Sequence, residues 1–323
     1  MPPESFPRVE KGPSLSENER QVFDVLAPAM EDARIKLENF TKYDPAKIKN
    51  DLVFVAKRKA EWEANPETRS SEHAKLAEAI IWNGINGGWM GEEAMSIVPS
   101  EYEDIDKGVD NVVRFEKKTG VAHLALAIDV TESAREVDRK IDGIFAGILG
   151  GQLTTLEYFE SKSKFGVHYQ GMLENIPKVI VASSQKSVGA VADRLAKLWE
   201  LTESAEKDPA SADKSQIDAI KKALSGSALK YKMLFEIREQ LSAFSRFAKE
   251  NGQSGLVGPH ERALALVNEV LDAELGKDKQ KEVLGKIMED EAVSEVFKKT
   301  AAGIKELKVA RPAPPPKPKE RWK

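Results

Sequence analysis

The sequence predicts an α/β protein in which a mixed β-sheet is flanked by helices, with further helical regions on both sides along the chain. Residues 108–131 read as two strands joined by a short turn, which predicts a β-hairpin. Apolar residues at helical spacing precede and follow this hairpin, and further short apolar runs come later. Strands and helices that follow one another in this way favour a sheet covered by helices.

The first 69 residues are predicted to form a disordered start and a helical leader. Residues 1–15 are expected to be disordered. Ser16 and Glu19 have the spacing of a capping box, and apolar residues recur at helical intervals after them. Pro28 and the Tyr-Asp-Pro segment at 43–45 are expected to break the leader into shorter helices.

The region 70–201 carries the predicted sheet. Its elements follow in the order helix, three strands, helix, strand, strand and helix. The expected elements are a helix at 70–88, a strand at 94–100, the hairpin strands at 109–116 and 121–130, a helix whose capping box is Ser133 and Glu136, strands at 154–159 and 177–183, and a helix with Val188, Val191, Leu195 and Leu198 on one side.

The C-terminal part of the chain is predicted to be helical beyond a linker. The polar segment 202–215 contains Pro209 and is typical of a linker. Within the helical region 216–310, helices are expected at 216–250, 259–275 and 278–308. Residues 311–323, RPAPPPKPKERWK, form a Pro-rich basic tail that is expected to be extended.

Asp110 and Asp129 stand where the two hairpin strands meet the loops. If Thr119 and Gly120 form a two-residue loop, Asp110 lies directly opposite Asp129, with Cβ atoms about 5 Å apart. A four-residue loop keeps both carboxylates on one face, whereas a three-residue loop separates them. The face that they share, which also carries Val112, Arg114, Glu116, His123, Ala125 and Ala127, is expected to be an open polar floor, and the other face to be core.

Two nearby carboxylates repel when ionised, so the pair needs a shared proton, a cationic partner or a divalent metal such as Mg²⁺. The alternative is that each aspartate ends its strand or accepts loop N–H groups. Asp104 and Asp106 are further candidate ligands, although their segment also reads as a solvated acidic loop. The chain has no cysteine, and its four histidines show no metal-binding spacing: His73, His123, His168 and His260.

The order of elements and the acidic residues resemble the core of the PD-(D/E)XK nuclease superfamily, the restriction-endonuclease-like fold, over about residues 70–201. The resemblance implies that Asp110 in GVD and Asp129 in AIDVT hold Mg²⁺ or Mn²⁺, and that Glu78 in KLAEAII belongs to the same site. Where the family has a lysine after the second acid, this chain has Thr131. Some members carry that lysine on the following helix, where Lys140 is the matching residue.

The resemblance therefore implies a Mg-dependent nuclease that cleaves phosphodiester bonds, with DNA as the expected substrate and Asp110, Asp129, Lys140 and Glu78 as its catalytic residues. Two alternatives stay open: a nuclease-fold domain that binds nucleic acid or protein without cleaving, and a helical scaffold with a structural central domain. Modest phosphate contact is expected from the basic residues near the site, which are Arg114, Lys117, Lys118, Arg135, Arg139 and Lys140.

Charge and hydropathy limit the partners. The net charge is -4 and 32% of the 323 residues are charged, so any nucleic-acid surface must be local. The start of the chain lacks the plan of a signal peptide, and no apolar run approaches the length of a membrane span, which predicts a cytoplasmic protein without a membrane partner. The C-terminal helices and the Pro-rich tail are candidate surfaces for a protein partner.

Overall fold

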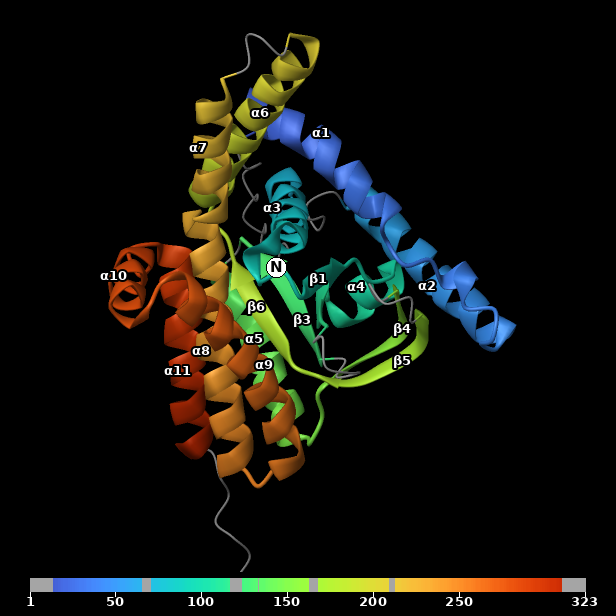
Figure 1. The fold of residues 1–323 in the computed structure, drawn as a ribbon. Helices are drawn as coiled ribbons and strands as arrows, with labels where there is room; N and C mark the ends of the chain where they lie inside the picture. Colours follow the sequence, from blue (N-terminus) through green and yellow to red (C-terminus); the bar gives the residue numbers. More distant parts are fainter. Residues whose placement is uncertain are drawn as a thin grey trace, which may run out of the picture.

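A mixed four-stranded sheet in the order β1-β2-β3-β6 lies at the centre of the computed structural model, which describes residues 14–65, 71–116, 124–132, 134–162, 168–208 and 213–309 (Figure 1). The β1/β2 and β2/β3 pairs are antiparallel, and β3/β6 is parallel. A separate two-stranded sheet is formed by β4 and β5. The strands are β1 Ala94–Ile97, β2 Asn111–Phe115, β3 Leu124–Thr131, β4 Thr154–Lys162, β5 His168–Ile176 and β6 Lys178–Ala182.

Helices surround the sheet, with α1 and α2 on one side of the molecule and α8 to α11 on the other (Figure 1). They are α1 Glu17–Asp32, the 3-10 turn η1 Leu37–Asn39, α2 Pro45–Ala64, α3 Glu72–Gly84 with the π turn η3 Ile85–Trp89, α4 Glu101–Lys107, α5 Ala134–Leu149, α6 Gln185–Lys207, α7 Lys214–Ser225, α8 Ala228–Glu250, α9 Ser254–Glu274, α10 Lys277–Ile287 and α11 Glu291–Val309. None of the described helices is long and apolar enough to cross a bilayer.

The mixed α/β class is confirmed, but one sheet face differs from the prediction. The strand expected at 154–159 lies outside the central sheet, because it pairs with β5. This β4/β5 hairpin covers the face that was expected to be an open polar floor, where Val112 and Ala127 are buried together with Leu156 and Tyr158. The sequence analysis missed β5 because its sequence, HYQGMLENI, mixes polar and apolar residues without regular alternation.

The opposite face of the sheet belongs to the main core, as expected. Val113, Leu126 and Ile128 are fully buried there in one cluster with apolar residues of α3, α5, α6, α8 and α9. Helices of the C-terminal region therefore pack onto the sheet through a shared core. The independent folding of residues 70–201 stays a prediction, and a truncation after residue 201 would expose this apolar surface.

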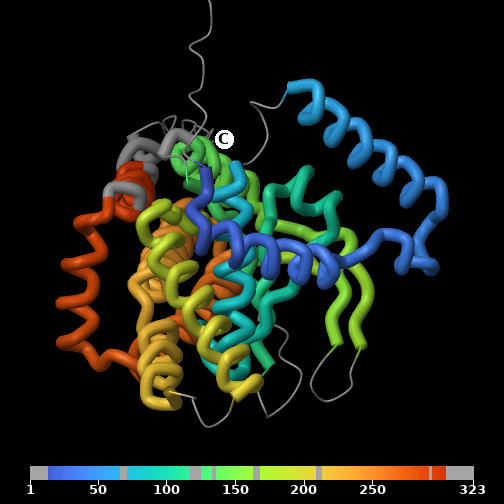
Figure 2. Tube along the Cα trace, turned by 90° about the horizontal axis from the view of Figure 1, so that it is seen from above, coloured from blue at the N-terminus to red at the C-terminus, as the bar shows by residue number. Residues whose placement is uncertain are grey.

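The N-terminal leader is helical, with one difference at Pro28. The capping box is present: Glu19 N–H donates to the Ser16 hydroxyl at 3.3 Å, and Ser16 N–H donates to the Glu19 carboxylate at 2.8 Å. The break at 43–45 is confirmed, since Asp44 caps α2. Pro28 was expected to break the helix, but it lies inside α1, where burial of apolar residues along the same helix offsets one lost backbone hydrogen bond. In Figure 2 the chain turns after α1, and α2 runs back at an angle to it along the edge of the molecule.

Four other segments differ from the prediction. The acidic segment before β2 is the helix α4 rather than a loop, with Ser100 as its N-cap and Gly108 as its left-handed C-cap. Residues 202–207 continue α6 instead of starting a linker. The helix expected at 216–250 is interrupted at Gly226, and the one expected at 278–308 is interrupted before Glu291. The Pro-rich tail lies outside the described residues.

Side chains of α8 cover the free edge of β6. Gln240 accepts a hydrogen bond from Ile180 N–H at 2.9 Å and donates to Ile180 C=O at 2.6 Å. The Glu236 carboxyl accepts from Ala182 N–H at 3.2 Å, and burial raises its pKa well above the usual range. These contacts take the place of a further strand, which could otherwise pair with the free edge of β6.

We expect Gln240→Leu to lower the free energy of unfolding by roughly 2–4 kcal/mol, because it leaves a buried N–H and a buried C=O of Ile180 without partners. Urea denaturation followed by circular dichroism measures the change. The control is Gln216→Leu on α7, where the side chain is exposed. Equal, small losses in both variants would show that α8 does not serve as an edge partner.

Candidate active site

The predicted site residues come from four neighbouring segments of the central sheet and its helices. Glu78 lies on α3, Asp110 directly before β2, Asp129 on β3 and Lys140 on α5. The chain enters β2 from α4 through Gly108, whose φ of 60° is left-handed. An added Cβ at Gly108 would lie 3.1 Å from Asp129 Oδ2, so glycine satisfies both the backbone turn and the close approach of the aspartate.

The observed strand register places the two aspartates side by side. Phe115 pairs with Leu124 and Asn111 with Ile128, which is the register expected for a two-residue loop and which puts Asp110 next to Asp129 across the strands. The turn itself lies outside the described residues. Asp110 Oδ2 accepts a hydrogen bond from Val130 N–H at 2.6 Å. One oxygen of Asp110 thus binds a backbone amide of β3, whereas the alternative interpretation named loop N–H groups as the donors.

Asp129 is held between two lysines. Its side chain is 3% exposed, Lys140 Nζ lies 2.5 Å from Oδ1, and Lys178 Nζ lies 2.8 Å from Oδ2. Lys178 also donates to the backbone carbonyl of Lys107 at 2.7 Å. Burial opposes the charge on Lys140, but Asp129, together with Asp110 and Glu136, outweighs it and raises the pKa of Lys140. Lys140 is therefore a fixed cation beside the aspartate pair at neutral pH.

Asp110 faces a second group of carboxylates, formed with Glu78 and Asp104. Burial, followed by the negative charges of Glu78, Asp129 and Asp104, raises the pKa of Asp110 well above its usual range. Burial and then Asp104 raise the pKa of Glu78 to about 8. Burial also raises the pKa of Asp104, although Arg34 opposes it. The cationic side chains near this cluster therefore do not compensate all of its negative charge.

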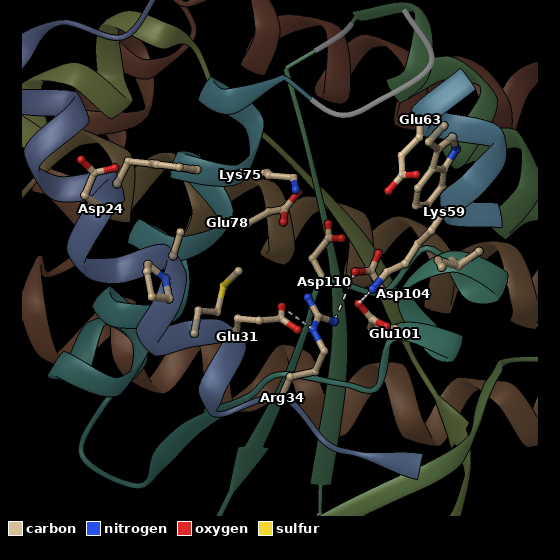
Figure 3. A pocket seen from close by; sticks show the side chains of 16 residues that line it. Asp24, Glu31, Arg34, Lys59, Glu63, Lys75, Glu78, Glu101, Asp104 and Asp110 are labelled. Carbon is tan, nitrogen blue, oxygen red and sulfur yellow. Dashed lines mark hydrogen bonds and ion pairs between the residues drawn. The ribbon is translucent and has the colours of Figure 1, made fainter. Parts of the chain in front are cut away.

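This acidic cluster forms one end of a cavity of about 710 Å³ between α1, α2, α3 and α4. In Figure 3, Glu78 and Asp110 point into it, with Lys75 beside Glu78. Arg34 lies below these residues in Figure 3 and joins two carboxylates of the lining. Its Nη1 lies 3.3 Å from Asp104 Oδ2, and its Nε lies 2.8 Å from Glu31 Oε2. Seven carboxylates and three cationic side chains of the described residues line this acidic cavity.

A second cavity of about 440 Å³ lies on the other side of the aspartate pair. Asp129 lines this one, and its described lining contains four cationic side chains and two carboxylates, namely Lys107, Arg139, Lys140, Lys178, Asp106 and Asp129. We call it the basic cavity. The two aspartates thus separate two cavities of opposite charge.

Hard oxygen ligands such as these carboxylates are those that Mg²⁺ and Mn²⁺ prefer. The raised pKa values of Asp110 and Glu78 fit a site at which a divalent cation would neutralise excess negative charge. Within the described residues, no three carboxylate or histidine side chains converge closely enough to hold a metal ion. A metal would therefore require Asp110, Glu78 and Asp129 to approach one another, with Asp129 releasing a lysine.

Several other candidate residues do not join the acidic cluster. Arg114 was expected to contact phosphate, but it is 1% exposed, because the β4/β5 hairpin covers it and its guanidinium bonds Glu116 and the Lys162 carbonyl. Asp106 forms an ion pair with Lys107 at 2.6 Å. The described histidines, His73, His168 and His260, lie elsewhere in the fold. Four further candidates lie outside the described part of the structure: Lys117, Lys118, His123 and the side chain of Arg135.

Sequence reasoning missed two cations of the site. Lys178 begins a strand and reads as an ordinary strand end, and only its parallel pairing with β3 brings it to Asp129. Arg34 follows α1 and contacts Asp104, which lies 70 residues later in the sequence. Neither contact has a signature in local spacing.

Comparisons of the chain with protein-family models, with curated proteins and with solved structures found no match. The site must therefore be interpreted from its own geometry.

Proposed function

We propose that this protein is a metal-dependent nuclease of the PD-(D/E)XK type that cleaves phosphodiester bonds, with DNA as the expected substrate. The observation that carries the proposal is the meeting of Glu78, Asp110, Asp129 and Lys140, which four separate elements bring to one place. These are the residues that the family resemblance assigned from the sequence.

The sheet topology supports the same proposal. α3 precedes an antiparallel meander of β1, β2 and β3, and α5 then leads to β6, which pairs parallel to β3. This is the element order that the restriction-endonuclease-like fold implies, with the β4/β5 hairpin as an addition between α5 and β6. The N- and C-terminal helices extend this core.

Each residue has a chemical role in such a reaction. Asp110, Glu78 and Asp129 would hold the metal ion, which when bound supplies an activated water and neutralises phosphate charge. The Lys140 ammonium group would stabilise the charge that develops on the phosphoryl oxygens. Asp129 orients Lys140 and keeps it protonated, and burial of the pair reduces competition from water.

We expect the purified chain to cleave DNA with Mg²⁺ or Mn²⁺, and calorimetry to detect Mn²⁺ binding. Asp110→Ala and Asp129→Ala should lose both cleavage and Mn²⁺ binding while circular dichroism shows an intact fold. The control is Asp24→Asn, which removes a carboxylate from the rim of the acidic cavity on α1. Single-stranded DNA, duplex DNA and RNA are compared as substrates.

Two results would count against the proposal. Undiminished Mn²⁺ binding by both alanine variants would show that Asp110 and Asp129 do not form the metal site. A parent protein that cleaves none of the substrates with either metal, yet retains nucleic acid in a salt-sensitive manner, would be a binding module instead.

A further inference from the structure

We propose that the basic cavity beside Asp129 is a phosphate subsite that holds the nucleic-acid backbone next to the cleaved bond. This inference rests on the proposed nuclease function, since it concerns the substrate of the same site. The ligand is a phosphodiester of a nucleic-acid strand, and the groups that would contact it are Lys107, Arg139, Lys140 and Lys178.

The charges of the two cavities favour entry of the nucleic-acid strand through the basic cavity. The described lining of the basic cavity has a formal charge of +2 from four cations and two carboxylates, whereas that of the acidic cavity is -4 from three cations and seven carboxylates when all are ionised, and it stays negative when Glu78 and Asp110 hold protons. A strand with one negative charge per nucleotide is attracted to the first and repelled by the second unless a metal is bound. The backbone would therefore approach from the Asp129 side.

The two cavities also meet at the proposed reaction centre. Asp110 lines the acidic cavity, the neighbouring Asp129 lines the basic cavity, and Ile105 lines both. A phosphate held by Lys178 would lie beside Asp129 and Lys140, and Arg139 would hold a neighbouring phosphate of the same strand. The same strand can be positioned by the basic cavity and presented to the carboxylates.

The face of α5 toward the basic cavity leaves room for a ligand. Arg139, Gly143 and Gly147 are spaced four residues apart, so they share one helix face, and all three line the cavity. A Cβ added at Gly143 would meet nothing within 4 Å. A side chain introduced there would enter open space without displacing the protein, which makes Gly143 a suitable position for a probe of the cavity.

The test compares Gly143→Glu with Gly143→Gln. Both side chains have nearly the same size, and both replace a helical glycine, so they differ mainly in one negative charge in the cavity. Binding of a short fluorescein-labelled single-stranded DNA is measured by anisotropy in EDTA, which removes divalent metal from the comparison. We expect the glutamate variant to bind about tenfold more weakly than the glutamine variant, as one charge a few ångströms from a phosphate implies.

The salt dependence gives a second readout. The slope of log affinity against log salt should be smaller by about one in the glutamate variant, because one phosphate contact is offset. Sodium pyrophosphate alone is titrated in parallel. If it binds and discriminates between the two variants while the DNA does not, the cavity takes a small free anion rather than a strand, and the proposal is overturned.

The outcome separates this inference from the proposed function. Equal DNA affinity of the two variants, in a parent protein that cleaves DNA, overturns the subsite and leaves the nuclease standing. Weaker binding by the glutamate variant, in a parent that cleaves nothing, supports the subsite and removes the nuclease.

Discussion

Lys140→Ala is expected to reduce the rate of DNA cleavage at saturating substrate by about 10²–10³, because removing one preorganised charge from a developing oxyanion typically costs this much. Mn²⁺ binding should persist and should not weaken, since the lysine is not a ligand and its removal frees one oxygen of Asp129. We expect this effect at Lys140 because the family resemblance assigns the catalytic lysine to it and because its ammonium group lies 2.5 Å from Asp129. Single-turnover cleavage and calorimetric Mn²⁺ titration measure the two quantities.

Lys178→Ala is the matched control, because Lys178 contacts the other oxygen of the same aspartate. Each variant leaves Asp129 with one lysine, and Lys178→Ala also loses the hydrogen bond to the Lys107 carbonyl. A purely structural role therefore predicts losses of stability and of rate in Lys178→Ala that are at least as large as those in Lys140→Ala. We expect instead a much larger loss of single-turnover rate at saturating DNA in Lys140→Ala. If Lys140→Ala cleaves as fast as the parent, the assignment of the lysine on α5 is wrong.

Glu78→Gln is expected to remove a pH-dependent loss of stability in the metal-free protein. The pKa of Glu78 is raised from the ordinary 4.5 to about 8, first by burial and then by Asp104. Between these values the folded state binds more protons than the unfolded state, so the free energy of unfolding falls as pH rises from about 4.5 to about 8. Because Glu78 keeps partial solvent contact, we expect a loss of roughly 2–4 kcal/mol rather than the full linkage value.

Urea denaturation in EDTA at several pH values between 5 and 8.5 tests this expectation. The difference between parent and variant reports Glu78 together with its effect on Asp110, and it excludes Glu103, whose pKa is raised to about 7 mainly by burial and which is present in both. The control is Glu72→Gln, an exposed carboxylate on the first turn of the same helix. Parallel stability curves for parent and Glu78→Gln would show that Glu78 is not part of a strained acidic cluster.

Added Mg²⁺ should reverse the loss at high pH in the parent and have little effect on Glu78→Gln, because a bound divalent cation would compensate the ionised carboxylates. The thermal midpoint with and without Mg²⁺ at pH 8 measures this. An equal shift in both proteins would place the metal away from Glu78.

The sequence alone determined the elements whose signals are local. The capping box of Ser16 and Glu19 predicts the start of α1, and helical periodicity predicts α3 and α5, because these patterns depend on residues within a few positions of one another. For the hairpin, the sequence left the loop length open: two- and four-residue loops keep Asp110 and Asp129 on one face, and the observed register is the one that a two-residue loop predicts. The identity of the candidate acids followed from these local patterns and from the family resemblance.

Only the tertiary structure decided what surrounds those acids. The β4/β5 hairpin covers the face that the strand pattern left open, and a polar strand with little periodicity does not reveal its partner. Lys178 reaches Asp129 through a parallel strand pair, and Arg34 reaches Asp104 from a distant helix end. Burial and long-range charge set the pKa values of Asp110 and Glu78, and both depend on groups brought together by folding rather than on spacing along the chain.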